Sequence, residues 1–289
     1  MRMGDENMKL KFLGTAAATS MPLAFCNCNI CIQARINGGK DFRTRSSLII
    51  NDEMLIDLGP DVVSQTNKYN IDLGKIKYLL QTHSHADHFD AGHFITRWSE
   101  YASKDLMPLS IICSKETCDD MNIWVKMQES SFDIYNELWQ KDLNYNLKFL
   151  KSGDILKLGE YVIIAIDSLH DDRLKALIYI ILYKDKTILY GTDLYKINEN
   201  SWSVISKYKY NAVILDQTYG KGYNNGGHLD AGQVMDIIGK MKKENLLLED
   251  AQLYATHISH EGNQNHEVLE KEAILNGYHI AYDGLELEL

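Results

Sequence analysis

The sequence predicts an α/β fold in which two β-sheets pack face to face and helices cover their outer sides, a four-layer αββα sandwich. Runs of short apolar strand patterns are separated by single helical patterns, which is typical of sheets packed with helices. The chain has 289 residues, of which 45% are hydrophobic and 24% are charged, as in globular proteins with a substantial core. It contains only 3 prolines and no linker-like tract. We therefore expect residues 1–289 to form a single domain.

The strands are predicted from short runs of apolar and β-branched residues that end at turn-forming or polar residues. Two hairpins are expected, because the short polar turns Asn51–Asp52 and Asp185–Lys186 each lie between two such runs. In chain order, the expected strands are Lys9–Leu13, Ser47–Ile50, Glu53–Ile56, Leu79–Thr82, Ser110–Ile112, Leu147–Leu150, Tyr161–Ile166, Leu177–Tyr183, Thr187–Tyr190, Ala212–Leu215, Leu253–Ala255, His279–Ala281 and Leu285–Leu289.

Helical patterns fall between some of these strands. The expected helices are Pro60–Tyr69, Phe89–Tyr101, Lys115–Gln128, Ser131–Trp139, Leu229–Glu244 and Asn265–Asn276. Residues 97–150 are richest in helical pattern. We expect them to form a helical insertion or cap over one end of the sandwich.

Charge and segment composition argue against several classes of protein. Lys and Arg number 30 and Asp and Glu number 40, which gives a formal net charge of −10. With no long basic run, nucleic acid is not an expected partner. The chain has no apolar run of the length of a membrane span and no signal-peptide core at its start, so we expect no membrane partner and a cytoplasmic location. A phosphorylated substrate is still compatible, because bound divalent cations supply local positive charge.

The most specific motif is H-x-H-x-D-H at residues 83–88, directly after the apolar strand Leu79–Thr82. Its ligand-type side chains are His83, His85, Asp87 and His88. Four such side chains within six residues would be costly to bury without a cation, and imidazole with carboxylate suits zinc, iron or manganese. On a loop, the first two can point to one metal and the last two to a second. The alternative is a solvated His-rich loop.

Three further candidates each follow an apolar run: His170, Asp193 and His257. The end of a strand is where a sheet delivers side chains to a common rim. Taken singly, each residue would more often be a capping or otherwise satisfied side chain. As a set, they would complete the ligands offered by residues 83–88.

These residues together resemble the metallo-β-lactamase superfamily, and the resemblance spans nearly the whole chain. It rests on HSHADH at residues 83–88, then His170, Gly191-Thr192-Asp193 and His257. It implies the αββα fold of that superfamily and a binuclear metal centre. The first ion would be held by His83, His85 and His170, the second by Asp87, His88 and His257, and Asp193 would bridge them. Asp57 resembles the superfamily's early aspartate that supports the metal loop, although a plain turn carboxylate is an equal alternative.

A second cluster narrows the resemblance. Cys26, Cys28 and Cys31 form C-x-C-x-x-C, and His260 follows His257 by three residues. Three thiolates and one imidazole make a closed tetrahedral zinc site, and in a reducing compartment such a cluster favours metal over disulfides. The alternative is a set of reduced core cysteines with an exposed histidine. The combination looks like the PhnP-type cyclic phosphodiesterases, whose Cys loop is fastened to the C-terminal histidine beside the active site.

Three other residue groups complete the list of candidates. His228, in Gly226-Gly227-His228, resembles the PhnP-type histidine that contacts the scissile phosphate and protonates the leaving oxygen; its alternative is a histidine at a helix entry. His93 is expected on a helix surface rather than at a metal. Cys113 and Cys118 lack ligand-type neighbours and are expected to be buried apolar residues.

The resemblance implies a metal-dependent phosphodiesterase that cleaves a small cyclic or nucleotide-like diester by attack of a metal-bridging hydroxide. His228 and Asp193 would be its catalytic residues. Its cofactors would be two divalent ions (zinc or manganese) in the catalytic site and one structural zinc, and its partners a small diester and a second copy in a homodimer. The first alternative is a tRNA 3′-processing-type endoribonuclease, although the chain lacks a long basic arm. The second is a non-catalytic metal-binding scaffold. A β-lactamase is disfavoured, because Asp193 stands where classical two-zinc lactamases carry cysteine.

Overall fold

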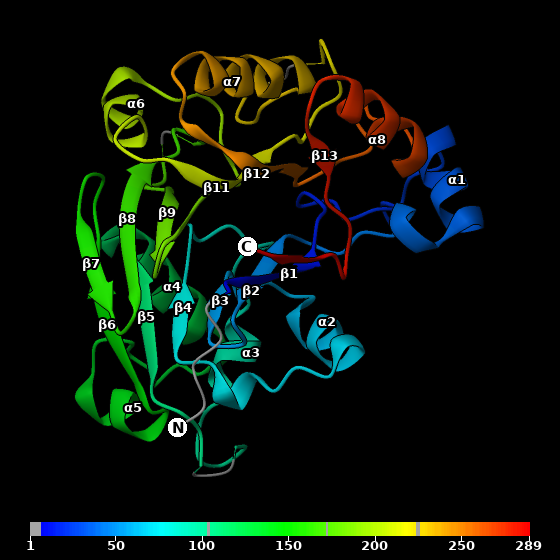
Figure 1. Ribbon diagram of the computed structural model, residues 1–289. Coiled ribbons are helices and arrows are strands. Elements are labelled where there is room, and N and C mark those ends of the chain that lie inside the picture. Colours follow the sequence, from blue (N-terminus) through cyan, green and yellow to red (C-terminus); the bar gives the residue numbers. More distant parts are fainter. Residues whose placement is uncertain (1–6, 103–104, 172, 224–225) are drawn as a thin grey trace.

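The computed structural model describes residues 7–102, 105–171, 173–223 and 226–289. Among these residues, two mixed sheets of seven strands each face one another (Figure 1). The first sheet contains β1 (Lys9–Gly14), β2 (Ser47–Ile50), β3 (Met54–Ile56), β4 (Tyr78–Leu80), β5 (Leu109–Cys113), β6 (Tyr145–Phe149) and β14 (Glu286–Glu288), in the order β14-β1-β2-β3-β4-β5-β6. The second contains β7 (Ile155–Leu158), β8 (Tyr161–Asp167), β9 (Leu177–Tyr183), β10 (Lys186–Gly191), β11 (Tyr210–Asp216), β12 (Leu247–Thr256) and β13 (His279–Ile280), in the order β13-β12-β11-β10-β9-β8-β7.

Helices cover the outer face of each sheet (Figure 1). The helices of the described residues are α1 (Asn29–Asn37), α2 (Val62–Tyr69), α3 (Ala91–Ile95), α4 (Lys115–Gln128), α5 (Glu137–Asp142), α6 (Glu199–Ile205), α7 (Ala231–Lys243) and α8 (His266–Leu275), with short 3-10 turns at Gly39–Asp41 and Leu73–Lys75. Helices α6, α7 and α8 lie on the second sheet, at the top of Figure 1. Helices α2, α3 and α4 pack on the first sheet.

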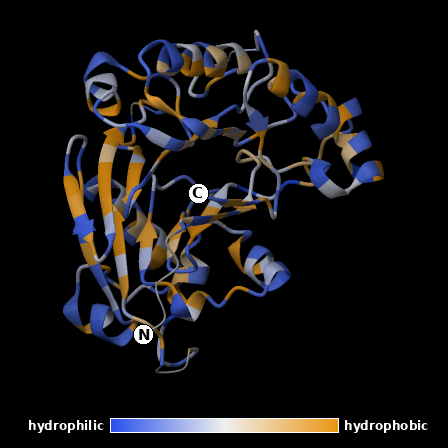
Figure 2. Cartoon of the chain, in the orientation of Figure 1, coloured by the Kyte–Doolittle hydropathy of each residue, from blue (hydrophilic) through white to orange (hydrophobic). Residues whose placement is uncertain are grey.

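Three apolar layers separate these four layers of structure. One fills the space between the sheets, and one lies under the helices of each sheet. In β8, Ile163 and Ala165 face the other sheet while Ile164 and Ile166 face the helices. A strand buried on both faces reads as a continuous apolar run, which is why Figure 2 colours such strands hydrophobic along their length. The predicted four-layer αββα sandwich is confirmed.

Several predicted elements are confirmed and others are wrong. The helix at Lys115–Gln128 and the hairpin around Asn51–Asp52 are confirmed. The predicted helix Phe89–Tyr101 is wrong beyond Ile95, where the Thr96 hydroxyl donates to the His93 carbonyl and the chain continues as tighter i→i+3 turns. The predicted helix Ser131–Trp139 is also misplaced.

Local side-chain bonds explain that second error. The carboxylates of Glu129 and Asp133 accept the backbone N–H groups of Ser131 and Tyr135, which folds residues 129–135 into turns. Helix α5 begins only after the Asn136 cap. Residues 97–150 contribute β5 and β6 to the first sheet in addition to α4 and α5; their expected role as a cap stays a prediction.

Among the described residues, no helix combines the length and the apolar character that crossing a bilayer requires.

Candidate metal centre

The ligand-type residues gather where strands of both sheets end. Residues 83–88, here called the metal loop, follow β4, while His170, Asp193 and His257 follow β8, β10 and β12. Asp193 and His257 adopt left-handed backbone conformations, with φ of 51° and 61°. Such angles are uncommon for residues other than glycine and concentrate at functional sites. They turn the chain sharply at the strand end and direct both side chains inward.

His83, His85 and His170 form the first cluster. The Nε2 atom of His83 lies 3.0 Å from Nδ1 of His85, which lies 3.3 Å from Nε2 of His170. Ligand nitrogens around a tetrahedral zinc are about 3.3 Å apart, given Zn–N bonds of about 2.0–2.1 Å. The three nitrogens therefore have the spacing of three ligands on one cation.

Asp87, His88, Asp193 and His257 form the second cluster, and all four are buried. Nε2 of His88 lies 2.9 Å from Oδ2 of Asp193, and Nε2 of His257 lies 3.2 Å from the same oxygen. Despite these short distances, none of the three atoms has a hydrogen-bond partner. Buried polar atoms rarely stay unpaired. Atoms that converge without bonding one another fit a divalent cation between them.

The opposite ring nitrogen of each histidine fixes which nitrogen faces the cluster. The Thr82 hydroxyl donates to Asp57 and so accepts from Nδ1 of His83 at 3.0 Å. The Thr218 hydroxyl donates to Asp216 in the same way and accepts from Nδ1 of His257 at 2.8 Å. With its proton engaged there, each ring presents a lone pair to the cluster, the form that binds a metal.

The other three histidines follow the same rule. Nδ1 of His88 bonds the Asp57 carboxylate at 2.7 Å, and Nδ1 of His170 bonds the Gly227 carbonyl at 2.5 Å. His85 is reversed: its Nε2 faces the carboxylate of Asp171 at 3.7 Å, so its Nδ1 faces the cluster. Each carboxylate or carbonyl orients a ring toward a cation position.

Asp193 joins the two clusters. Its Oδ1 lies 3.5 Å from Nε2 of His170 and 3.9 Å from Nε2 of His83, on the side of the first cluster. Its Oδ2 faces His88 and His257 in the second. One carboxylate thus offers an oxygen to each cluster, which is the geometry of a bridging ligand.

Buried negative charge also fits cations. The carboxylates of Asp57, Asp87, Asp193 and Asp216 are 0–7% exposed. Burial opposes a charged imidazole, yet the carboxylates of Asp193, Asp87 and Asp57 raise the pKa of His88 well above its usual value. The buried carboxylates thus favour positive charge at the cluster, which bound cations would supply.

His228 lies beside the metal clusters. Its Nδ1 bonds Oδ2 of Asp216 at 2.8 Å and lies 3.9 Å from Oδ1 of Asp193. Burial lowers the pKa of His228, but the neighbouring carboxylates, Asp216 first, outweigh it and raise the pKa to about 9. The Asp216 contact therefore favours the protonated imidazole, in which Nε2 as well as Nδ1 carries a proton.

The cysteine cluster lies around His260. The Sγ atoms of Cys26, Cys28 and Cys31 are 3.5, 3.3 and 3.6 Å from Nδ1 of His260. Zn–S bonds of about 2.3 Å and Zn–N bonds of about 2.0–2.1 Å place sulfur and nitrogen about 3.5 Å apart in a tetrahedron. The four side chains therefore match the dimensions of a closed zinc site.

Thiol acidity in this cluster is also consistent with a cation. Burial opposes the thiolate of Cys28, but hydrogen bonds, first from His260, lower its pKa to about 6. Burial and the neighbouring thiols raise the pKa of Cys31 to about 11. Without a cation, one sulfur is therefore ionised and another keeps its proton, whereas a dication favours the thiolate of both.

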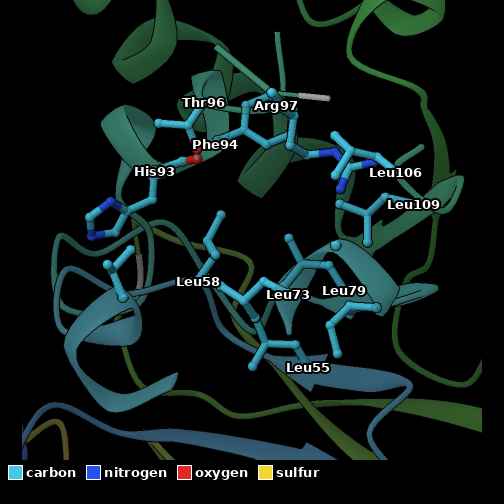
Figure 3. A pocket seen from close by; sticks show the side chains of 14 residues that line it. Leu55, Leu58, Leu73, Leu79, His93, Phe94, Thr96, Arg97, Leu106 and Leu109 are labelled. Atoms are coloured by element: carbon cyan, nitrogen blue, oxygen red, sulfur yellow. Dashed lines mark hydrogen bonds between the residues drawn. The ribbon is translucent and has the colours of Figure 1, made fainter. Parts of the chain in front are cut away.

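The remaining sequence candidates lie outside the clusters. Cys113 and Cys118 are fully buried, as expected. His93 belongs to none of the clusters that could hold a metal among the described residues; its Nε2 lies 3.0 Å from the Pro60 carbonyl. It borders an apolar cavity of about 240 Å³ between α3 and the first sheet, together with Leu58, Phe94 and other side chains (Figure 3). No residue of the metal clusters lines that cavity.

Sequence reasoning missed Asp216 and Asp171. Asp216 ends β11 next to β10 and β12, so its carboxylate reaches the same rim as Asp193 and His257. The available signal was a lone acidic residue directly after a fully apolar run, the pattern that identified Asp193. Asp171 follows His170 in a polar stretch and has no comparable signal.

Comparison with known proteins agrees with this geometry. The sequence-family model of the β-lactamase superfamily domain matches residues 53–258. The chain belongs to this superfamily. Its members are metal-dependent hydrolases, and the chain is a hydrolase of this class whose His and Asp clusters have the arrangement of metal ligands. No curated protein matches the chain.

Several solved structures share the fold. A diphosphatase of the PhnP family is 21% identical, with a TM-score of 0.73 over 98% of this chain and 97% of that one. Zinc-bound PqqB from Methylobacterium extorquens is 15% identical, with a TM-score of 0.69 over 97% and 100%. The short form of human tRNase Z is 18% identical, with a TM-score of 0.64 over 96% and 98%. At these identities the likeness concerns the fold.

Proposed function

We propose that the protein is a metal-dependent phosphodiesterase that hydrolyses a small cyclic or nucleotide-like diester. One observation carries this proposal. Asp193 belongs to the second ligand cluster and directs Oδ1 toward the first, and His228, whose Nδ1 bonds Asp216, lies beside both. Two joined cation positions suit a phosphoryl group, whose oxygens can bind both ions, and a neighbouring acid suits the departing alkoxide.

The cations would be held by residues of this chain. His83, His85 and His170 would hold one ion, Asp87, His88 and His257 the other, and Asp193 both. When bound, two divalent ions supply positive charge that activates water and stabilises charge on the phosphoryl oxygens. Zinc and manganese both suit this mixture of imidazole and carboxylate.

His228 would act as general acid. Its Nδ1 bonds Asp216, which restrains the ring and would leave the proton on Nε2 for a leaving oxygen. Asp216 is itself fixed by the Thr218 backbone N–H and hydroxyl at 2.8 and 2.9 Å. An oriented imidazolium of this kind would protonate an alkoxide as the P–O bond breaks.

The cysteine cluster would hold a separate structural zinc. Cys26, Cys28, Cys31 and His260 share no residue with the catalytic clusters. His257 and His260 lie on one short segment, so this zinc would also hold a catalytic ligand in place. The proposal therefore predicts three ions per chain.

The test measures metal content and turnover together. Protein reconstituted with zinc or manganese should contain close to three ions by elemental analysis, and it should hydrolyse bis(p-nitrophenyl) phosphate and a 2′,3′-cyclic nucleotide. His85→Ala should abolish turnover. His279→Ala, a half-exposed histidine paired with Glu270, serves as control and should leave turnover unchanged.

Two outcomes would contradict the proposal. Protein that holds its ions and hydrolyses neither diester would exclude a general phosphodiesterase. Cleavage of a precursor tRNA without turnover of the small diesters would favour the endoribonuclease alternative.

A further inference from the structure

Gln81 belongs to neither ligand cluster, yet its side chain lies against the metal loop. It directly follows β4 and is 0% exposed. A buried carboxamide needs partners for both donors and for its oxygen, because an unpaired polar group costs free energy in the interior.

The carboxamide is bonded on all sides. Its Nε2 donates to the carbonyl of His83 at 2.8 Å, to the carbonyl of His88 at 2.9 Å and to Oδ1 of Asp57 at 3.1 Å. Its Oε1 accepts the Leu58 N–H at 3.4 Å. The three partners of Nε2 are acceptors only, so the orientation of the amide is determined.

The two carbonyls belong to the first and last ligands of the metal loop. His83 lies in the first cluster and His88 in the second. By bonding both carbonyls, one NH₂ group links the two ends of the loop. Backbone hydrogen bonds inside the loop do not link its two ends in this way. The N–H groups of His88 and Phe89 both donate to the His85 carbonyl.

Asp57 connects the Gln81 carboxamide to the ligand ring of His88. Its carboxylate accepts from Gln81, from Thr82 and from Nδ1 of His88. Removing the Gln81 amide would therefore free two loop carbonyls and weaken the support of a ligand ring in one step.

We propose that Gln81 is a positioning residue that fixes the separation of the two metal subsites by clasping the carbonyls of His83 and His88, so that one side chain controls the affinity of both ions. The proposal rests on the binuclear centre of the proposed function and not on its substrate.

The test compares two buried glutamines. Gln81→Met keeps the length of the side chain and removes its hydrogen bonds. Gln65→Met is the matched control, because Gln65 is also buried and its Nε2 donates to Thr44 Oγ1 at 2.8 Å and the Arg45 carbonyl at 2.9 Å, with no contact to a ligand. Zinc affinity of metal-free protein is measured without substrate by competition with a chromophoric chelator, and cobalt-loaded protein gives a ligand-field spectrum.

We expect Gln81→Met to lose about 10–100-fold in affinity for both catalytic ions, as for other residues that orient ligands, and to change the cobalt spectrum. Gln65→Met should keep both affinities and the spectrum, although it also removes buried hydrogen bonds and should lower the melting temperature of metal-free protein. If Gln81→Met fails to fold, Gln81→Asn is used instead. Asparagine keeps the amide but is one methylene shorter, so this variant should also lower the affinity for both ions.

The proposal would be overturned if Gln81→Met kept its affinity for both ions or lost affinity for only one of them. An equal loss of affinity in Gln65→Met would also overturn it. Because no substrate is used, wild-type protein that binds both ions but hydrolyses no diester would refute the proposed function and leave this result intact.

Discussion

A single carboxylate joins the two halves of the metal centre. Asp193 is 2% exposed and directs one oxygen to each ligand cluster. Its left-handed backbone costs about 1–3 kcal/mol, a strain that the surrounding sheet must compensate. Backbone strain of this kind concentrates at functional sites. In Asp193 the strained backbone directs one carboxylate oxygen to each ligand cluster.

His228 should matter most for poor leaving groups. An alkoxide needs a proton as it departs, whereas p-nitrophenolate leaves without one. General acid catalysis contributes about 10²–10⁴-fold, so His228→Ala should lose that much in kcat/KM on an alkyl or ribosyl diester and clearly less on bis(p-nitrophenyl) phosphate. Both substrates are assayed at equal metal occupancy.

Asp216→Asn is the informative companion, because it keeps the shape of the partner that holds Nδ1 but removes the charge that raises the pKa of His228. Like His228→Ala, Asp216→Asn should lose more kcat/KM on the alkyl or ribosyl diester than on bis(p-nitrophenyl) phosphate, but its losses should be smaller. Equal losses on both substrates in His228→Ala would reassign this residue to phosphate binding.

At the scale of elements, the ends of strands were predictable and the internal hydrogen-bond partners were not. His170, Asp193 and His257 could be found because each follows an apolar run that reads as a buried strand. Asp216 has the same setting but no motif around it. Gln81 could not be found, because its role depends on where two carbonyls of a loop lie after folding.

Helix boundaries were also hard to predict where they depend on side-chain hydrogen bonds that form only on folding. Lys115–Gln128 was predictable because the Ser114 cap and an apolar face agree. The shortened α3 and the late start of α5 depend on side chains that bond their own backbone. Helix α1 was missed because it begins inside the cysteine cluster, where Cys28 itself is the cap.

The loop that leads into α1 should stabilise the fold through its zinc, whereas the metal loop should serve turnover. Structural zinc sites contribute several kcal/mol, and each kcal/mol shifts the melting temperature of a domain this large by about 2–4 °C. Cys28→Ala should therefore lower the melting temperature of zinc-loaded protein by about 10 °C or more and lose one ion.

His85→Ala is the comparison. It should lose turnover while metal-free protein melts within a few degrees of wild type, since His85 is 36% exposed and makes few structural contacts. Normal melting and full zinc content in Cys28→Ala would refute the structural zinc.

Across the whole molecule, a buried polar network ties the N-terminal segment to α8 and the C-terminal segment. Arg43 is 2% exposed and contacts the Thr15 hydroxyl, the Ala281 carbonyl and Nδ1 of His266. Asp283 accepts from Thr15 and Thr44. The network joins segments that are far apart in sequence, so it should respond to conditions that alter its charges.

Acid should weaken this network through His266. Burial and then the Arg43 charge lower the pKa of His266 from 6.5 to about 4, because its Nδ1 must accept from the guanidinium. The unfolded chain takes up this proton below about pH 6.5 and the folded chain only near pH 4. The contribution of His266 is therefore fully present above pH 6.5 and lost as the pH falls toward 4.

The free energy of unfolding of metal-free protein, measured in urea at pH 7 and pH 5, should fall less between these values in His266→Gln than in wild type. Using metal-free protein removes the pH dependence of ion binding. The same fall in both proteins would show that His266 does not titrate in this range.

The zinc cluster also has a consequence for biosynthesis. Its three cysteines precede His260 by 229–234 residues, and ribosomes add roughly 5–20 residues per second. The cysteines are therefore added to the chain roughly 10–50 s before their fourth partner exists. The last catalytic ligand, His257, arrives with His260. A nascent chain thus exposes three reactive sulfurs and an incomplete centre until residues 257–260 have been added, and cleavage or stalling shortly before residue 257 would leave a product with neither site.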